Sequence, residues 1–458
     1  MGRLGQHKSV RLFLLATSLT LLAGCSSLQG INHLPAAEQA RDTVKDWQYQ
    51  QSEATYVSHL NDLVAVPELD QLVQTALAHN PGLQQTALAL KIAYADKRIA
   101  AADRLPTAAA GFSQTRAENA EDSYAAELTV SWELDLWHKL SDSVKAAEMD
   151  IAGSAAGYQA ARDALAASVM RAWLAIIQQR QLITIEESRL QVLESNERLI
   201  TQRYRSGLGD LEELDNARTS SASTRATLAQ YTESLAQAER ALRQLLGQQD
   251  TTISLPTTQD FPQVIQPLSL FPNQDLARRP DLQQAYYNIV AAQYQTEVAY
   301  KDLLPSISLS ATLSDIGASA GDALFTSPAW SLLGQLTAPL FQGGKLKAQA
   351  EIAELTAEQQ FWAYQETLLT AVTEVNDALG QEQALQQQQQ HIHDALTSAR
   401  RSVSSYEAKY RQGLVDILDL LTVQQQTFDL QSQLVQLIYN RLANRIDLGL
   451  ALGLEAAS

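Results

Sequence analysis

Alternation of apolar and polar residues along the chain predicts four short β-strands. Residues 306–314 place every apolar side chain on one face and every hydroxyl on the other, and residues 124–136 alternate in the same way. Weaker alternation covers residues 107–115 and 330–340. A half-buried sheet in a soluble protein would produce the same pattern. We favour membrane strands, because each segment is about ten residues long, as tilted barrel strands are, and aromatic residues cluster around them.

Four strands cannot close a membrane barrel, because the smallest known barrels have about eight. The pattern therefore predicts an oligomer whose copies share one barrel, and periodicity does not decide between two copies and three. In such a barrel the polar faces of the strands would line a wet pore. Glu127, Glu133 and Asp135 lie on the polar face of the 124–136 segment, together with serine and threonine.

Two stretches without proline, residues 139–206 and 345–412, predict very long helices. At about 1.5 Å per residue, each helix would be roughly 100 Å long. Apolar residues from Ile392 to Tyr410 recur at steps of four and three, as in coiled coils. Four shorter helices are predicted over about 69–101, 211–246, 272–303 and 415–450. The summed length of each pair matches one long helix, which predicts short helices stacked end to end.

The whole pattern occurs twice along the chain. Pro81-Gly82-Leu83 recurs 199 residues later as Pro280-Asp281-Leu282, and the turn sequence at 204–208 recurs 206 residues later at 410–414. Each copy contains a helix, two strands, a long helix and a return helix. We therefore interpret the chain as two structural repeats with an irregular segment before them, a proline-rich linker between them and a short tail. The boundaries are 25–65 for the segment, 66–247 and 272–453 for the repeats, 248–271 for the linker and 454–458 for the tail.

Composition and motifs exclude several functional classes. The net charge of −17 argues against a nucleic-acid binder and against a polybasic membrane-surface protein. A single cysteine excludes a disulfide framework and a Cys-based zinc site. His391 and His393 are two residues apart and do not share a helical face, so no metal site is predicted. Phosphate-binding loops and nucleophile motifs are absent, which favours a passive conduit over an enzyme.

The N-terminus has the pattern of an export signal. Basic residues precede an apolar stretch at 12–22, and Leu22-Ala23-Gly24-Cys25 follows it. This segment resembles a bacterial lipobox, which implies a lipoprotein signal peptide at 1–24 and acyl chains such as palmitate on Cys25. The alternative is a plain signal peptide followed by an incidental cysteine. Ser26 after the cysteine permits, by the same resemblance, sorting to the outer membrane.

Almost the whole mature chain resembles the TolC-type outer-membrane efflux channels, and the lipobox makes it most similar to the lipoprotein branch typified by OprM. The resemblance rests on the duplication, the strand pairs, the long helices and the repeated Tyr-x-x-Gly turn. The segment Val415 to Asp419 is also similar to one at the periplasmic mouth of TolC. The resemblance implies a homotrimer with a barrel in the outer membrane and an α-helical tunnel through the periplasm. It also implies two partners, a periplasmic membrane-fusion adaptor and an inner-membrane pump of the resistance-nodulation-division type.

Two acidic pairs follow the repeated turns. Asp416 and Asp419 have counterparts 206 residues earlier, at Asp210 and Glu213. Carboxylates at the start of a helix favour its dipole, so helix capping alone is one interpretation. The other is a periplasmic gate, because copies in an oligomer would gather the carboxylates into a ring of the kind found in cation-selective constrictions. TolC has a longer, basic-containing loop here, so gate salt bridges of its kind are not expected.

By the same resemblance, the turns at Gly207-Leu208 and Gly413-Leu414 are the adaptor contacts. The predicted fold class is therefore an α+β membrane protein, with a barrel assembled from several chains and continued by a helical tunnel. Its predicted function is the outer-membrane exit duct of a tripartite efflux system for small toxic compounds. No cofactor is predicted beyond the lipid on Cys25. The alternatives are an exit duct for protein secretion and a structural lipoprotein without a pore.

Overall fold

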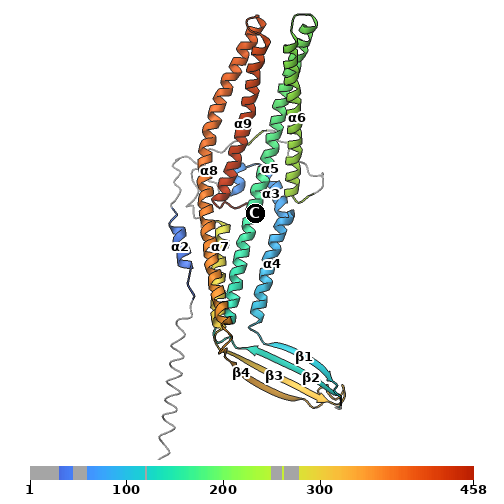
Figure 1. Ribbon diagram of the computed structural model, residues 1–458, viewed down its shortest axis with the longest axis vertical. Helices are drawn as coiled ribbons and strands as arrows, with labels where there is room; N and C mark the ends of the chain where they lie inside the picture. Colours follow the sequence, from blue (N-terminus) through green and yellow to red (C-terminus); the bar gives the residue numbers. More distant parts are fainter. Residues whose placement is uncertain (1–29, 45–58, 119–120, 249–259, 263–277, 458) are drawn as a thin grey trace, which may run out of the picture. The chain divides into compact units, whose positions relative to one another are not determined.

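The computed structural model describes residues 30–44, 59–118, 121–248, 260–262 and 278–457. The first part of the chain contains α2 (Leu34–Asp42), the 3-10 helix η2 (Leu60–Val64), α3 (Pro67–His79), α4 (Pro81–Ala102), β1 (Thr107–Thr115), β2 (Ser123–Glu133), α5 (Lys139–Arg205) and α6 (Leu211–Leu245). The second part contains α7 (Pro280–Lys301), β3 (Ser306–Gly317), β4 (Ala329–Thr337), α8 (Lys345–Arg411) and α9 (Ile417–Ala451). From α4 and from α7 onward, the two parts follow the same order of elements (Figure 1).

The two long helices agree with the sequence prediction to within one residue. Both α5 and α8 are 67 residues long. The helix predicted over 69–101 is divided into α3 and α4, because the extended residue Asn80 is followed by Pro81, which has no N–H to continue the first helix. Residues 272–277, the first part of the helix predicted over 272–303, lie outside the described residues.

The strands form one antiparallel sheet in the order β1-β2-β3-β4 (Figure 1). The centre of the sheet joins the two repeats, since β2 pairs with β3 with Tyr124 opposite Gly317. β1 and β4 are the edges, and every residue in both edge strands is exposed. The two repeats therefore meet in the middle of the sheet, and each repeat contributes one of its two edge strands.

The predicted strands at 124–136 and 330–340 end early, at Glu133 and Thr337. The interpretation of Asp135 as a pore-lining strand residue is wrong. Its carboxylate accepts hydrogen bonds from the backbone N–H groups of Leu140 at 2.9 Å and Ser141 at 2.8 Å, at the start of α5. Burial raises the pKa of Asp135, but the Ser141 hydroxyl and the two amides outweigh it and lower the pKa overall. A helix-start carboxylate thus continued the alternating pattern past the end of the strand.

The chain divides into two compact units, and each unit takes segments from both repeats. The first unit contains the sheet and consists of Met1–Thr43, Ala89–Ala156 and Gln283–Thr367. The second consists of Val44–Leu88, Gly157–Leu282 and Leu368–Ser458. The predicted repeats are units of sequence and topology, and their boundaries remain an interpretation. The signal peptide, Cys25 and most of the linker at 248–271 lie outside the described residues.

The second unit has a large hydrophobic core where α3, α5, α6 and α9 meet. Its fully buried side chains include Met170, Trp173 and Ile177 of α5, Leu242 of α6 and Ile446 of α9. Burial of each such side chain contributes about 1.5–3 kcal/mol to folding. The last described residues join this core, because Leu454 and Ala456 are buried and the Leu60 N–H donates to the Glu455 carbonyl at 3.0 Å.

Part of the segment at 25–65 that was predicted to be irregular is helical. The helix α2 has a proline in its first turn, where the missing N–H costs no hydrogen bond. It lies within the first unit, where the Tyr286 hydroxyl donates to Glu38 at 3.0 Å and the Gln293 amide donates to Asn32 at 2.8 Å. None of the helices in the described ranges is both long enough and apolar enough to span a membrane.

Candidate functional site

The turns that close the two helical hairpins have the same geometry. Gly207 and Gly413 have φ angles of 70° and 74°, a left-handed conformation that glycine adopts without strain. The N–H of Gly207 donates to the Tyr204 carbonyl at 3.0 Å, and the N–H of Leu208 donates to the Arg203 carbonyl at 2.9 Å. This pair of hydrogen bonds is a Schellman motif, which satisfies the last carbonyls of α5 and reverses the chain. Gly413 and Leu414 repeat it at the end of α8.

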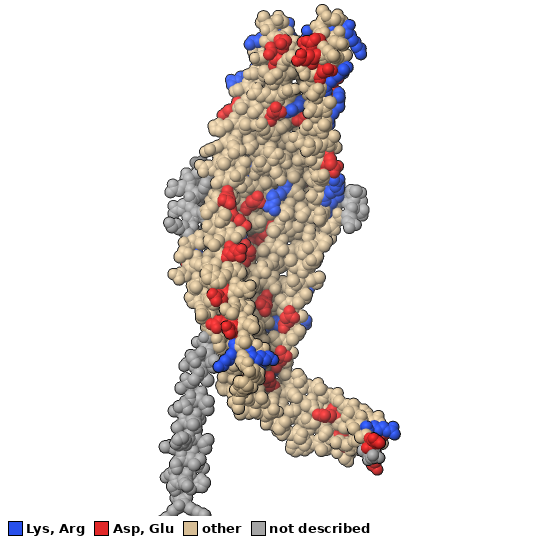
Figure 2. Space-filling view, in the orientation of Figure 1, with Lys and Arg blue, Asp and Glu red and all other residues tan. Residues whose placement is uncertain are grey.

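The leucine after each glycine is exposed at the end of its hairpin. Leu208 is 72% exposed and Leu414 is 68% exposed, although this position in a Schellman motif often packs back onto the helix. Charged side chains of both signs surround these ends, which lie at the top of the view in Figure 2. The two turns therefore present apolar side chains to the surroundings within a charged rim.

The acidic pairs that follow the turns cap the return helices. The Asp416 carboxylate accepts the N–H of Asp419 at 2.9 Å, and the Asp210 carboxylate accepts the N–H of Glu213 at 2.7 Å. Asp210 and Asp416 are the N-cap residues of α6 and α9, so the capping interpretation is correct for both. Within the described part of the chain, none of these four carboxylates has an ion-pair partner. Any ring of gate carboxylates would form only between copies of the chain.

A small hydrophobic cluster packs the two hairpins together next to their turns. Its buried members are Leu193 and Ile200 of α5, Leu214 and Ala217 of α6, and Ile417, Leu420 and Leu421 of α9. Tyr406 and Tyr410 of α8 pack against it. Since Asp416 and Asp419 flank Ile417, the candidate gate residues lie at the edge of the contact between the hairpins.

Two residues that the sequence pattern did not single out join the stacked helices. The Asn80 side chain donates to the carbonyl of Leu245, the last residue of α6, at 2.9 Å, and it accepts the Leu83 N–H at 3.0 Å. Arg279, at the equivalent position of the second repeat, donates to the carbonyl of Ala451, the last residue of α9, at 2.9 Å. Each junction is thus joined by the residue before the repeated proline. The offset of 199 residues was the signal that could have identified both.

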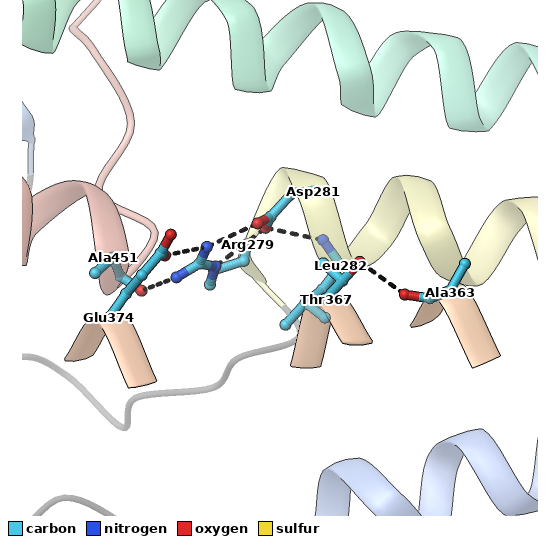
Figure 3. Close-up of polar contacts among 7 residues, drawn as sticks. All are labelled: Arg279, Asp281, Leu282, Ala363, Thr367, Glu374 and Ala451. Atoms are coloured by element: carbon cyan, nitrogen blue, oxygen red, sulfur yellow. Dashed lines mark hydrogen bonds and ion pairs between the residues drawn. The ribbon is translucent and has the colours of Figure 1, made fainter. Parts of the chain in front are cut away.

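Arg279 is the centre of a buried polar network (Figure 3). Its guanidinium donates to Asp281 at 2.7 Å and to Glu374 of α8 at 2.8 Å, and only 7% of the residue is exposed. Burial lowers the pKa of Arg279, but hydrogen bonds and attraction from Asp281 and Glu374 raise it overall. Within the described ranges, Asn80 forms no such contact to α5. The second junction is therefore the more tightly held, because it ties α7, α8 and α9 at one point.

A cleft of about 1000 Å³ opens beside the Arg279 junction, within the second unit. Asp163 lies in its wall and accepts the N–H of Ala456 at 2.9 Å. Burial raises the pKa of Asp163 from 3.8 to about 6. The folded protein therefore keeps this proton to a higher pH than the unfolded chain does. The stability that the protonated carboxyl contributes is lost as the pH rises from 3.8 through about 6. Among the residues that the structure describes, no group of side chains could hold a metal ion.

Comparisons with known proteins identify the family. The family model described as Outer membrane efflux protein matches residues 72–248 and 271–454. The probable outer membrane lipoprotein SilC of Salmonella typhimurium is 27% identical over 457 residues, which cover 95% of this chain and 97% of SilC. The antibiotic efflux pump outer membrane protein ArpC of Pseudomonas putida is 27% identical over 464 residues, 96% of this chain and 94% of ArpC.

The fold is also that of a solved channel. The crystal structure of the Campylobacter jejuni CmeC outer membrane channel superposes with a TM-score of 0.81 at 20% identity, covering 91% of this chain and 95% of CmeC. The predicted α+β fold class, the resemblance to TolC-type channels and the outer-membrane location are therefore confirmed, as is the role of an outer-membrane efflux component. The family consists of transport ducts rather than catalysts. This chain is a member of the outer membrane efflux protein family.

Proposed function

We propose that the protein forms a homotrimeric duct that exports small toxic compounds, which it receives from an inner-membrane pump of the resistance-nodulation-division type through a periplasmic adaptor. The description of ArpC as an antibiotic efflux pump protein supports small compounds over secreted proteins as the cargo. The charge-rimmed leucines of the turns, at Leu208 and Leu414, provide adaptor contacts that protrude from the hairpin ends. The energy for transport comes from the pump.

The open edges of the sheet are the main support for an oligomer. The edge strand β4 exposes Trp330 (79%), Leu332 (69%) and Leu336 (68%), and its backbone has no partner on the outer side among the described strands. An exposed apolar edge strand pairs readily with another strand. Pairing of β4 with β1 of the next copy would close the sheet between copies. The family resemblance implies three copies.

We expect native mass spectrometry of the full-length protein in detergent to show three chains per complex. The same preparation should give stable conductance steps in planar lipid bilayers, because a passive duct conducts ions without an energy source. A monomer as the only species, or trimers that never conduct, would contradict the proposal. Loss of the gene should also raise sensitivity to dyes and detergents; a block in secretion of a protein instead would favour the secretion duct.

We also propose that Cys25 carries the lipid anchor, as the description of SilC as a lipoprotein supports. Gly30, five residues later, lies in the first unit, where an added Cβ would meet the Thr296 side chain of α7 at 2.7 Å. Gly30 therefore lies against α7, close to the helix end that leads into β3. An acyl anchor at Cys25 would reach the membrane on the side of the sheet.

The paired variant Asp416→Asn with Asp419→Asn tests whether these two carboxylates form a charged gate. Asparagine is as good an N-cap as aspartate, so α9 should keep its cap and the complex should assemble normally. The variant removes two negative charges per chain at the mouth. We therefore expect a lower preference for cations, measured as a smaller reversal potential in asymmetric KCl.

The matched control is Asp210→Asn with Glu213→Gln, which removes the equivalent charges from the first hairpin. A ring dominated by the second hairpin predicts a smaller change for this control. A reversal potential equal to that of the wild type in the Asp416 and Asp419 variant would mean that these carboxylates act as helix caps only.

A further inference from the structure

The connection between β4 and α8 leaves two large apolar side chains uncovered. Leu340 is 94% exposed and Phe341 is 89% exposed, the highest values among the large apolar residues that the structure describes. Both lie between the end of β4 at Thr337 and the start of α8 at Lys345. Leu336, near the end of the strand, is also exposed. The apolar surface of the edge strand therefore continues into the connection.

Two lysines follow these apolar residues at the start of α8. Lys345 and Lys347 are exposed, and neither forms an ion pair with another described residue. The first turn of α8 contains no acidic residue. Positive charges near the N-terminus of a helix oppose its dipole, so these two lysines do not stabilise α8. Figure 2 shows basic side chains where the helices of the first unit meet the sheet. The two charges are therefore free to bind a group outside the chain.

The equivalent connection of the first repeat is neutralised within the chain. Lys139, 206 residues before the first of the two lysines, lies 3.0 Å from Glu133 and 3.4 Å from Asp302. Asp135 takes the place of Phe341, and its carboxylate accepts the first backbone N–H groups of α5. The lysine and the helix start thus both have carboxylate partners there. The unpaired lysines of the second repeat are not required by the shared fold.

The order of the side chains in this connection matches the order of groups in a bilayer. Apolar residues come next to the sheet, where the outer membrane has its hydrocarbon core, and the lysines come next to the helices. Lysine lays its methylene stem along apolar surface and places its ammonium group in the headgroup layer. Large apolar residues beside that layer contact the ends of the acyl chains nearest the headgroups.

We propose that residues 340–347 form a binding site for an anionic phospholipid in the leaflet on the helix side of the sheet. Leu340 and Phe341 contact the acyl chains, and Lys345 and Lys347 bind the phosphate group. A free phosphate ion would use the lysines but not the apolar side chains beside them, whereas a phospholipid uses both. The site goes beyond the proposed function, because it does not depend on what the duct exports.

The test is native mass spectrometry of the full-length protein in detergent, freed of copurified lipid and titrated with dioleoylphosphatidylglycerol or dioleoylphosphatidylcholine. Both lipids have the same acyl chains and a phosphate group, but only phosphatidylglycerol has a net negative charge. We expect Lys345→Gln with Lys347→Gln to weaken binding of phosphatidylglycerol roughly 25-fold, since each lysine near a membrane surface contributes about 5-fold. Binding of phosphatidylcholine should change much less.

Phe341→Ala tests the apolar half of the site. It removes contact with the acyl chains, which the two lipids share, so it should weaken binding of both lipids by the same factor. A loss for phosphatidylglycerol alone would overturn the assignment of Phe341 to the acyl chains. The same spectra give the number of chains per complex, so a change in assembly is recorded separately and would contradict only the proposed trimer.

The matched control is Arg400→Gln with Lys409→Gln, which removes two exposed positive charges from the same helix, roughly 80–95 Å from its start. It should leave the affinity for phosphatidylglycerol unchanged. Equal affinities in the wild type and in the variant of Lys345 and Lys347 would overturn the lipid site. Complete displacement of phosphatidylglycerol by millimolar inorganic phosphate would also overturn it, because the site would then take a free anion.

Discussion

Glu382→Gln is expected to lower the stability of the full-length protein by about 3–5 kcal/mol, the usual cost of removing one partner of a buried ion pair. Glu382 of α8 accepts hydrogen bonds from Arg441 at 3.0 Å and from Arg445 at 2.8 Å, both on α9. Glutamine keeps the shape of the side chain but removes the charge that the two arginines share. Both guanidinium groups are almost completely buried, so water cannot replace the carboxylate. The measurement is the urea midpoint for loss of the helical circular dichroism signal in detergent.

The control for this prediction lies on the same helix. Glu407 of α8 pairs with Arg411 at 3.8 Å, and the two side chains are 40% and 78% exposed. Glu407→Gln should change the stability by less than about 1 kcal/mol, because exposed ion pairs contribute little. If both variants lost stability equally, burial of the Glu382 ion pairs would not be what stabilises the contact between α8 and α9.

Gly247→Ala is expected to disrupt the junction between α6 and α4. Gly247 has a φ angle of 70°, and an added Cβ would lie 2.2 Å from the backbone oxygen of His79. The left-handed conformation costs an alanine about 1–2 kcal/mol, and overpacking against backbone adds about 1–3 kcal/mol. The chain must shift to relieve the contact, which would break the Asn80 hydrogen bond to the Leu245 carbonyl. A lower urea midpoint for helix loss would report the change.

Gly413→Ala separates the two causes. Gly413 has nearly the same φ angle, 74°, but no heavy atom lies within 4 Å of an added Cβ. This control should therefore pay only the conformational cost and lose about half as much stability or less. Similar losses in the two variants would mean that Gly247, after the end of α6, is not in close contact with His79 at the end of α3.

Local pattern was enough to predict most elements of the fold. Alternation identified all four strands, because successive side chains along a strand point to opposite faces of the sheet. The absence of proline identified α5 and α8, and the glycines at 207 and 413 marked their ends, since only a left-handed residue closes a Schellman motif without strain. The duplication supplied the order of the elements, because both copies carry the same signals.

The pattern misled at the edges of elements, where two structures share one signal. Asp135 continues the alternation of the preceding strand, yet it caps the helix that follows. Asp416 and Asp210 were open to two interpretations, because a cap and a ring of gate carboxylates both need an acid after the turn. The geometry within one chain confirms the caps, whereas the ring depends on other copies and stays a prediction.

By itself, then, the sequence determined the strands, the long helices, the duplication and the family resemblance, because these depend on residues that are near neighbours along the chain. Only the tertiary structure decided which charged residues meet. Arg279 reaches Ala451, Glu382 reaches Arg441 and Arg445, and Arg189 reaches Asp429. Many other acidic and basic residues carry the same local signal. Their pairing depends on how the helices pack, because a charge is stabilised in the interior only where packing places its partner.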